Sequence, residues 1–139
     1  MYEPKTRPRR FLAVVAFIGS ALLFLFWFLY WSETIHAGVE DSPIARFEAA
    51  FPAADALLAL MLLGAGIGLL RGRAYGTFLL VGAAGMTLYL GILDCTFYFT
   101  QGMIDFSSAD GRFQTAVIAC CLVGGILGLW QSWRLWSTR

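Results

Sequence analysis

Long apolar stretches alternate with short polar connections along the chain. Four such stretches cover about residues 11–31, 52–70, 76–99 and 113–133. Each is close to the roughly 20 residues that an α-helix needs to cross a bilayer. Because the connections are short, consecutive helices should run in opposite directions. The pattern therefore predicts an all-α protein, built as an antiparallel bundle of four transmembrane helices.

The first apolar stretch allows two interpretations. A basic segment with two prolines, residues 1–10, precedes it, and we expect that segment to lie outside the helix. A basic segment, an apolar stretch and a sequence such as that at 35–37 are also the parts of a secretory signal peptide. The stretch is longer than a usual signal-peptide core and rich in Phe and Trp, which favours a retained span. Trp27, Tyr30 and Trp31 should then form an aromatic belt at its outer end.

The connection between the first two spans contains a possible short helix. Ser42 suits a helix N-cap, and Pro43 suits the first helical position. Ile44, Phe47 and Phe51 follow at spacings that place them on one helical face. We therefore expect a short amphipathic segment on the outer membrane surface.

Charged residues are few and unevenly placed. Only 14% of the 139 residues are charged and 59% are hydrophobic, whereas soluble domains carry roughly 25% charged residues. We therefore expect a membrane lipid as partner, no nucleic acid, and a single membrane domain over residues 1–139. On one side of the predicted bundle lie Lys5, Arg7, Arg9, Arg10, Arg71, Arg73, Arg134 and Arg139, and on the other Arg46 and Arg112. The positive-inside rule then predicts cytoplasmic termini and location in the inner (plasma) membrane.

Glycines at helical spacing occur in the second and fourth spans, as Gly64-x-x-x-Gly68 and Gly124-x-x-x-Gly128. Small residues in this pattern let two helix backbones approach closely in a membrane. Two interpretations stay open. We favour packing within one chain; the alternative is a homodimer contact through Gly64 and Gly68 or through Gly124 and Gly128.

Two carboxylates, Asp55 and Asp94, lie inside apolar spans. An ionised carboxylate costs about 2.5–3.5 kcal/mol at a helix centre, so such groups usually point into a bundle or a wet cavity. From the helical rise, both should lie about 5–8 Å inside the outer boundary, on neighbouring antiparallel helices. They are placed so that they can face one another, which suggests a polar pocket.

Each carboxylate also has a structural interpretation. Asp55 lies in the first turn after Pro52, where the helix dipole favours a carboxylate, and a pairing with Arg46 would make it a helix-start device. Asp94 lies deeper in its span and could simply make an interhelical hydrogen bond. Ligand contact or proton transfer is the functional alternative, with Asp94, Asp55 and Tyr98 as catalytic candidates. Asp94 carries most of this functional hypothesis.

Further side chains are candidates for the same pocket. Tyr98 follows Asp94 by four residues, so both can share a helical face, and Gly91 leaves room for a ligand or a neighbouring helix. The other candidates for ligand binding are Tyr89, Glu48 and Gln114. His36 is a lone histidine of a connection and only a weak candidate for a metal ligand.

Several classes of protein are disfavoured. Cys95, Cys120 and Cys121 lie inside apolar stretches without zinc-type spacing. Adjacent side chains on a helix point about 100° apart, so Cys120 and Cys121 make a poor redox pair. The common motifs of zinc peptidases, nucleotide-binding proteins and serine hydrolases do not occur in the sequence. We therefore expect no cofactor.

A spaced pattern runs through the chain after residue 45. It comprises Glu48-x-x-Phe51-Pro52-x-Ala54-Asp55, a basic Arg71-Gly72-Arg73 turn, Tyr89-x-Gly91-x-x-Asp94-x-x-x-Tyr98 and Gly102. This pattern resembles a family of uncharacterised small four-span bacterial integral membrane proteins. The resemblance implies four spans and singles out the same carboxylates, but it implies no activity.

These observations lead to one expectation and two alternatives. We expect a multi-pass membrane protein, such as an accessory subunit, that binds a lipid or small amphiphile in an outer-leaflet polar pocket. The first alternative is a membrane enzyme that acts on a lipid or isoprenoid-like substrate by carboxylate acid/base chemistry. The second is a small proton-coupled transporter that works as an oligomer. Whether the chain is an enzyme stays open at this point.

Overall fold

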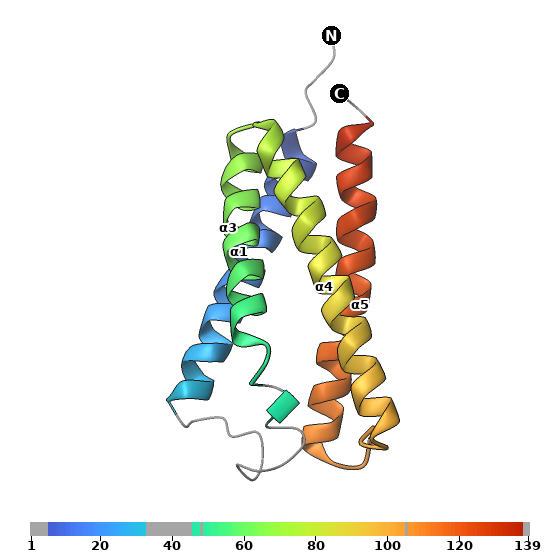
Figure 1. Cartoon of the computed structure of the whole chain (residues 1–139). Coiled ribbons are helices and arrows are strands. Elements are labelled where there is room, and N and C mark those ends of the chain that lie inside the picture. The colour runs from blue at the N-terminus through green and yellow to red at the C-terminus, as the bar shows by residue number, and fades with distance from the viewer. Residues whose placement is uncertain (1–5, 33–45, 48, 105, 138–139) are drawn as a thin grey trace. The chain divides into compact units, whose positions relative to one another are not determined.

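The computed structural model describes residues 6–32, 46–47, 49–104 and 106–137, which are mostly helical (Figure 1). The helices are α1 (Thr6–Trp31), α3 (Pro52–Leu70), α4 (Ala74–Thr100) and α5 (Ala109–Trp136). All four are long and apolar enough to cross a membrane, and the described residues contain no strand. The predicted all-α class with four membrane-spanning helices is confirmed, and the chain is built as a multi-pass membrane protein.

The second predicted span matches α3, whereas the other helices are longer than their apolar stretches. The expectation that residues 1–10 lie outside the helix is wrong from Thr6 onward. Pro8 is tolerated there because N–H groups in the first helical turn have no acceptor within the helix. At the other end of the chain, α5 begins at Ala109 because the Ser108 side chain accepts a hydrogen bond of 3.0 Å from the Gly111 N–H.

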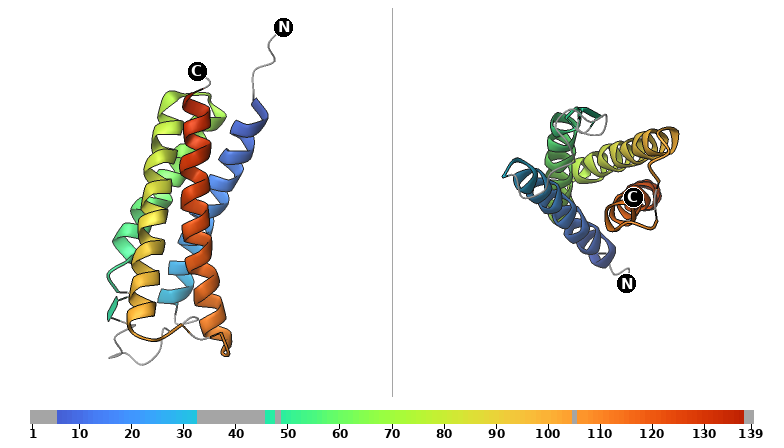
Figure 2. Two further views of the ribbon diagram at one scale, coloured as in Figure 1. Left: turned by 90° about the vertical axis from the view of Figure 1, so that its right-hand side faces the viewer. Right: turned by 90° about the horizontal axis from the view of Figure 1, so that it is seen from below.

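The chain divides into two compact units, one ending at Leu79 and the other beginning at Leu80. The first unit holds α1, α3 and the first turns of α4. Here α1 and α3 lie side by side and run in opposite directions (Figure 2). The second unit holds the rest of α4, paired with α5 in the opposite direction. The single membrane domain of residues 1–139 stays a prediction.

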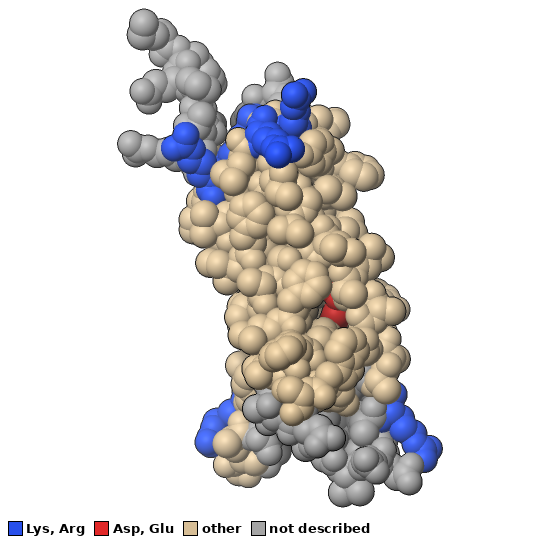
Figure 3. All heavy atoms as spheres, turned by 90° about the vertical axis from the view of Figure 1, so that its left-hand side faces the viewer, with Lys and Arg blue, Asp and Glu red and all other residues tan. Residues whose placement is uncertain are grey.

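One face of α1 packs on protein, and the other is exposed and apolar. Buried positions on the packed face include Ala13, Ala16, Ser20 and Trp27. Exposed large side chains on the other face are Phe11, Val14, Ile18, Leu22 and Leu25. In a space-filling view, a surface without Lys or Arg extends between ends that carry these residues, and a single acidic patch is visible within it (Figure 3). A helix that faces lipid is expected to show this distribution, with small residues on the protein side.

A tight turn brings the end of α3 against the start of α4. Gly72 adopts a φ of 65°, the Arg73 N–H donates to the Gly68 carbonyl at 2.9 Å, and the Gly72 N–H donates to the Leu69 carbonyl at 3.2 Å. These bonds form a Schellman motif, which satisfies the last carbonyls of α3. A Cβ on Gly68 would lie 2.5 Å from the Gly76 Cα. Glycine is therefore required where the two backbones cross.

Glycine also forms the contact between α4 and α5 in the second unit. A Cβ on Gly125 would lie 2.6 Å from the Leu88 Cβ, and one on Gly128 would lie 2.8 Å from the Ala84 Cβ. A Cβ on Gly124 would meet no atom within 4 Å. In α5, the glycines that approach α4 closely are therefore Gly125 and Gly128. Gly128 belongs to the predicted pair, whereas Gly125 takes the place of its predicted neighbour Gly124.

Three of the four predicted small-residue positions are filled by the chain itself. A Cβ on Gly64 would lie 2.8 Å from the Leu79 Cδ1, and Gly68 and Gly128 have the close contacts given above. Packing within the chain is therefore confirmed for these three glycines. A homodimer contact through either pair stays a prediction.

The predicted amphipathic segment before α3 falls largely outside the described residues. Ser42, Pro43 and Ile44 are among those left undescribed. Phe47 and Phe51 are described, and their rings meet edge to face with centroids 4.8 Å apart. Their contact agrees with the predicted shared face for this pair.

Candidate functional site

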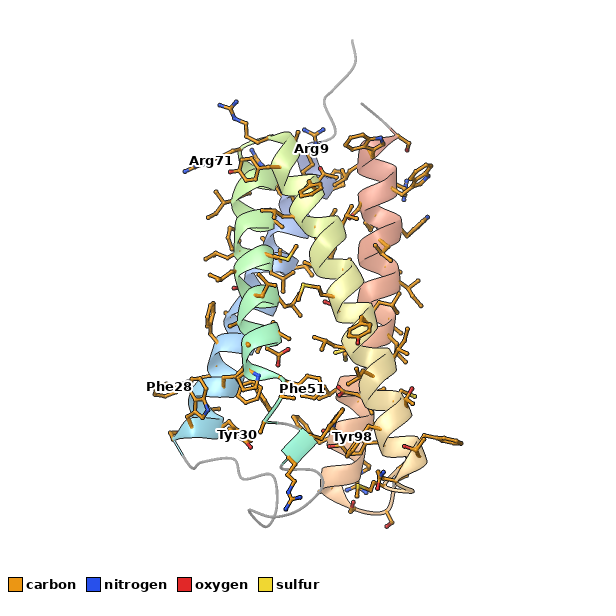
Figure 4. The ribbon with its side chains drawn as sticks, viewed as in Figure 1. Arg9, Phe28, Tyr30, Phe51, Arg71 and Tyr98 are labelled. Carbon is orange, nitrogen blue, oxygen red and sulfur yellow. The ribbon has the colours of Figure 1, made fainter. Side chains whose placement is uncertain are left out.

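Aromatic side chains gather at one end of the first unit, where α1 ends and α3 begins. Figure 4 shows Phe28, Tyr30 and Phe51 at this end, and Arg9 and Arg71 at the opposite end. Aromatic rings and arginine side chains both favour the boundary between hydrocarbon and water. The first unit thus has two chemically different ends.

Trp27 is the centre of the aromatic end. Its ring is 8% exposed and meets Phe26 and Tyr30 edge to face, with centroids 5.3 and 5.1 Å away. Trp31 lies 6.1 Å away and is 70% exposed. The predicted aromatic belt therefore suits Trp31, whereas Trp27 faces the protein. Such a buried indole normally needs an acceptor for its N–H group.

Asp55 supplies that acceptor. The Trp27 Nε1 donates a hydrogen bond of 2.9 Å to Asp55 Oδ2, and this bond joins α1 to the first turn of α3. Pro52 begins α3, and the Asp55 N–H donates to the Phe51 carbonyl at 2.9 Å. Asp55 lies in the first turn of α3, as predicted, but its carboxylate bonds across to α1, and its described partner is Trp27 and not the predicted Arg46.

The second oxygen of this carboxylate is open. Asp55 is half-buried, and within the described part of the chain Trp27 is the side chain that donates to it. No buried side-chain oxygen in that part lacks a partner, so Oδ1 lies at the surface of the unit. Trp27 fixes the orientation of the carboxylate while leaving one oxygen able to accept a hydrogen bond.

A second polar contact lies deeper between the same helices. The Ser20 hydroxyl donates a hydrogen bond of 2.8 Å to the Ala59 carbonyl, and both residues are almost fully buried. This partner pair was not predicted from the sequence. One signal in the sequence could have indicated it: Ser20 is an isolated hydroxyl in the middle of an apolar span. A hydroxyl inside a bilayer needs an acceptor within the protein.

The candidates on α4 belong to the second unit. Asp94 is half-buried, Tyr98 is 7% exposed one helical turn later, and Tyr89 is 64% exposed. The Tyr98 ring meets that of Phe97 with centroids 5.5 Å apart. Asp94 and Tyr98 share one region of α4, as predicted from their spacing, whereas Tyr89 points outward. That Asp94 faces Asp55 stays a prediction.

Gly91 was one candidate for making room beside Asp94. A Cβ there would lie 2.9 Å from the Cys121 Cβ and 3.0 Å from the Leu122 N. Of the two predicted uses of Gly91, a ligand or a neighbouring helix, the space is taken by α5. Gln114 lies in the second turn of α5 and is half-buried.

Two predicted residues, Glu48 and His36, lie outside the described residues. Elsewhere, the described residues bring no three His, Cys, Asp or Glu side chains together in a group that could hold a metal ion. Cys95, Cys120 and Cys121 form no disulfide.

No family model, curated protein or solved structure matches the chain. The resemblance to small four-span bacterial membrane proteins stays a prediction.

Proposed function

We propose that the protein binds a lipid or small amphiphile at the aromatic end of α1 and α3, with Asp55 as the polar contact. The observation that carries the proposal is the 2.9 Å hydrogen bond from Trp27 Nε1 to Asp55 Oδ2. It holds a carboxylate in one orientation inside a membrane-spanning helix and leaves Oδ1 able to accept a hydrogen bond.

The surroundings of Asp55 support a headgroup that carries a positive charge or a hydroxyl. A carboxylate attracts both kinds of donor. The ring of Tyr30 packs against Trp27, and the face of an aromatic ring attracts cations within about 6 Å. Phe28, at the same end, is 68% exposed and offers an apolar surface for an acyl chain. Polar and apolar contacts thus lie next to one another, as an amphiphile requires.

The charge pattern supports an outer-leaflet position for this site. Arg9 and Arg71 lie at the end of the first unit opposite the aromatic end (Figure 4). If the arginine end faces the cytoplasm, as the positive-inside rule indicates, Asp55 lies toward the outer leaflet of the inner membrane. This orientation, with cytoplasmic termini, is part of the proposal.

The test compares lipids that copurify with the wild type and with Asp55→Asn. The asparagine amide keeps an oxygen for Trp27 but loses the negative charge, so the helix pair should survive. We expect the variant to unfold at nearly the same temperature in detergent and to lose at least about tenfold of one lipid class, because charge-assisted hydrogen bonds contribute about 1.5–3 kcal/mol. Mass spectrometry of the extracted lipids measures the loss.

Thr96→Ala provides a matched control. Thr96 is exposed and donates within α4 to the Ile92 carbonyl at 2.8 Å, so its loss should change neither the fold nor the retained lipid. An Asp55→Asn variant that is folded and retains the wild-type lipid profile would contradict the proposal.

A further inference from the structure

Arginines from three parts of the first unit meet at the end opposite Asp55. Arg9 is on α1, Arg71 directly follows α3, and Arg73 precedes α4. A Cβ on Gly72 would lie 3.9 Å from Arg9 Nη1, so the guanidinium of α1 reaches over the turn between α3 and α4. Figure 4 shows Arg9 and Arg71 at this end, and Figure 3 shows basic side chains gathered there.

These three arginines, the arginine cluster, lack protein counterions in the part of the chain that the structure describes. No described residue forms an ion pair with Arg9, Arg71 or Arg73, and none accepts a hydrogen bond from their guanidinium groups. The described acidic residue of this unit is Asp55, about 24 Å away along α3 at a rise of about 1.5 Å per residue. Among the described residues, the cluster therefore presents several unused donors and a positive charge without a counterion.

The neighbours of the cluster are apolar or amphipathic. Phe11 is 66% exposed beside the start of α1, and Leu70 is 55% exposed beside Arg71. Tyr75 is 42% exposed, with its ring over the crossing of Gly68 and Gly76. A soluble anion needs only the guanidinium groups. A phospholipid also needs an apolar surface below the headgroup, and this end of the unit supplies one.

We infer that the arginine cluster binds the phosphate of an anionic phospholipid, at a second site separate from the one proposed around Asp55. Arginine presents parallel N–H donors that match phosphate oxygens, and a basic residue near a membrane surface contributes about fivefold to the binding of acidic lipid. Arg9 contributes from α1, while Arg71 and Arg73 contribute from the turn. A lipid bound there bridges α1 to the junction of α3 and α4.

The test measures lipid binding to purified full-length protein in detergent. The probes are short-chain phosphatidylglycerol, short-chain phosphatidylcholine and inorganic phosphate, each read by native mass spectrometry and by the shift in unfolding temperature. We expect the wild type to prefer phosphatidylglycerol to phosphatidylcholine. The triple variant R9Q/R71Q/R73Q should lose about a hundredfold of that preference, as three contributions of about fivefold multiply. The triple Lys variant should keep part of it.

R46Q/R112Q/R134Q is the matched control, because it removes the same number of charges from arginines outside the cluster. An equal loss in this control would show a diffuse charge effect and overturn the proposal. A wild type without preference for phosphatidylglycerol would also overturn it, as would an equal shift with inorganic phosphate, which would assign the cluster to a soluble anion. If the triple variant does not fold, Arg9→Gln should still lower the preference about fivefold, and an unchanged preference would overturn the proposal.

Discussion

The two helix pairs of this protein are held together by different kinds of contact. Between α1 and α3, two side chains donate hydrogen bonds across the interface, Ser20 to the Ala59 carbonyl and Trp27 to Asp55. Between α4 and α5, an added Cβ on Gly125 would lie 2.7 Å from the Leu88 N and one on Gly128 would lie 2.8 Å from the Ala84 Cβ. Lipid tails are as apolar as leucine, so burial alone gives membrane helices little reason to associate. Both pairs bring glycines close to the partner helix. In α5, Gly125 faces the backbone of α4, whereas in α3 Gly66 faces the Phe17 ring of α1, beside the two side-chain hydrogen bonds.

The difference affects what each pair can do. A glycine contact brings backbones together and leaves no polar atom available to a ligand. A hydrogen bond between a side chain and a carboxylate fixes the register and also orients a charged group. The α1 and α3 pair thereby combines stability with the proposed binding function.

The largest expected effect on stability comes from Gly125→Ala, at the contact between α5 and α4. Its Cβ would lie 2.6 Å from the Leu88 Cβ and 2.7 Å from the Leu88 N, so the backbone of α4 must move. We expect a loss of roughly 1–3 kcal/mol in the free energy of unfolding. Unfolding by a denaturing detergent, followed by circular dichroism, measures it.

The neighbouring variant Gly124→Ala is the control, since its Cβ meets nothing within 4 Å. It should be neutral or slightly stabilising, because alanine favours helix by about 1 kcal/mol over glycine. Equal destabilisation by both variants would mean that glycine packing does not hold this pair.

Trp27→Phe should have the next largest effect. It keeps an aromatic ring but removes the donor to Asp55, so the pair loses its hydrogen bond and part of its packing. We expect a loss of about 1–2 kcal/mol in the free energy of unfolding, measured in the same assay. Trp31→Phe is the control, because Trp31 is 70% exposed and should tolerate the change. Equal tolerance of both would argue against a stabilising role for the bond.

Ser20→Ala should cost less. The variant removes the hydroxyl that donates to the Ala59 carbonyl, which keeps its own bond within α3, so only the interhelical contribution of about 0.6 kcal/mol is lost. A double variant with Trp27→Phe tests whether the two bonds act together. If they reinforce one another in a single interface, the double loss will differ from the sum of the single losses.

The smallest effect on stability is expected for Asp94→Asn. The substitution preserves the shape of the side chain and one carbonyl oxygen, so the unfolding temperature should hardly change. If Asp94 contributes to the same lipid site as Asp55, the variant should still retain less of the lipid class that Asp55→Asn loses. Mass spectrometry of copurified lipid decides this, and an unchanged profile would limit the site to the first unit.

Sequence reasoning was most successful where a local rule acts alone. Pro52 and the Arg71-Gly72-Arg73 turn mark both ends of α3, and its predicted bounds are correct. Sequence reasoning was less successful where the hydrogen-bond partner of a side chain is remote in sequence. Nearly every residue of α1 from Phe11 onward is apolar, so periodicity could not tell whether Trp27 faces lipid or protein. The sequence identified Asp55 as a carboxylate inside an apolar span, but it did not identify its hydrogen-bond partner Trp27, 28 residues earlier.

The bond between Trp27 and Asp55 also has a consequence for biosynthesis. A ribosome delivers the chain from its N-terminus, so α1 leaves it before α3 does. The indole can therefore already be in the bilayer when the carboxylate enters. The Trp27 N–H is then available to donate a hydrogen bond to Asp55 as α3 enters, which lowers the free-energy cost of placing the carboxylate in hydrocarbon. The order of synthesis thereby assists the insertion of this residue.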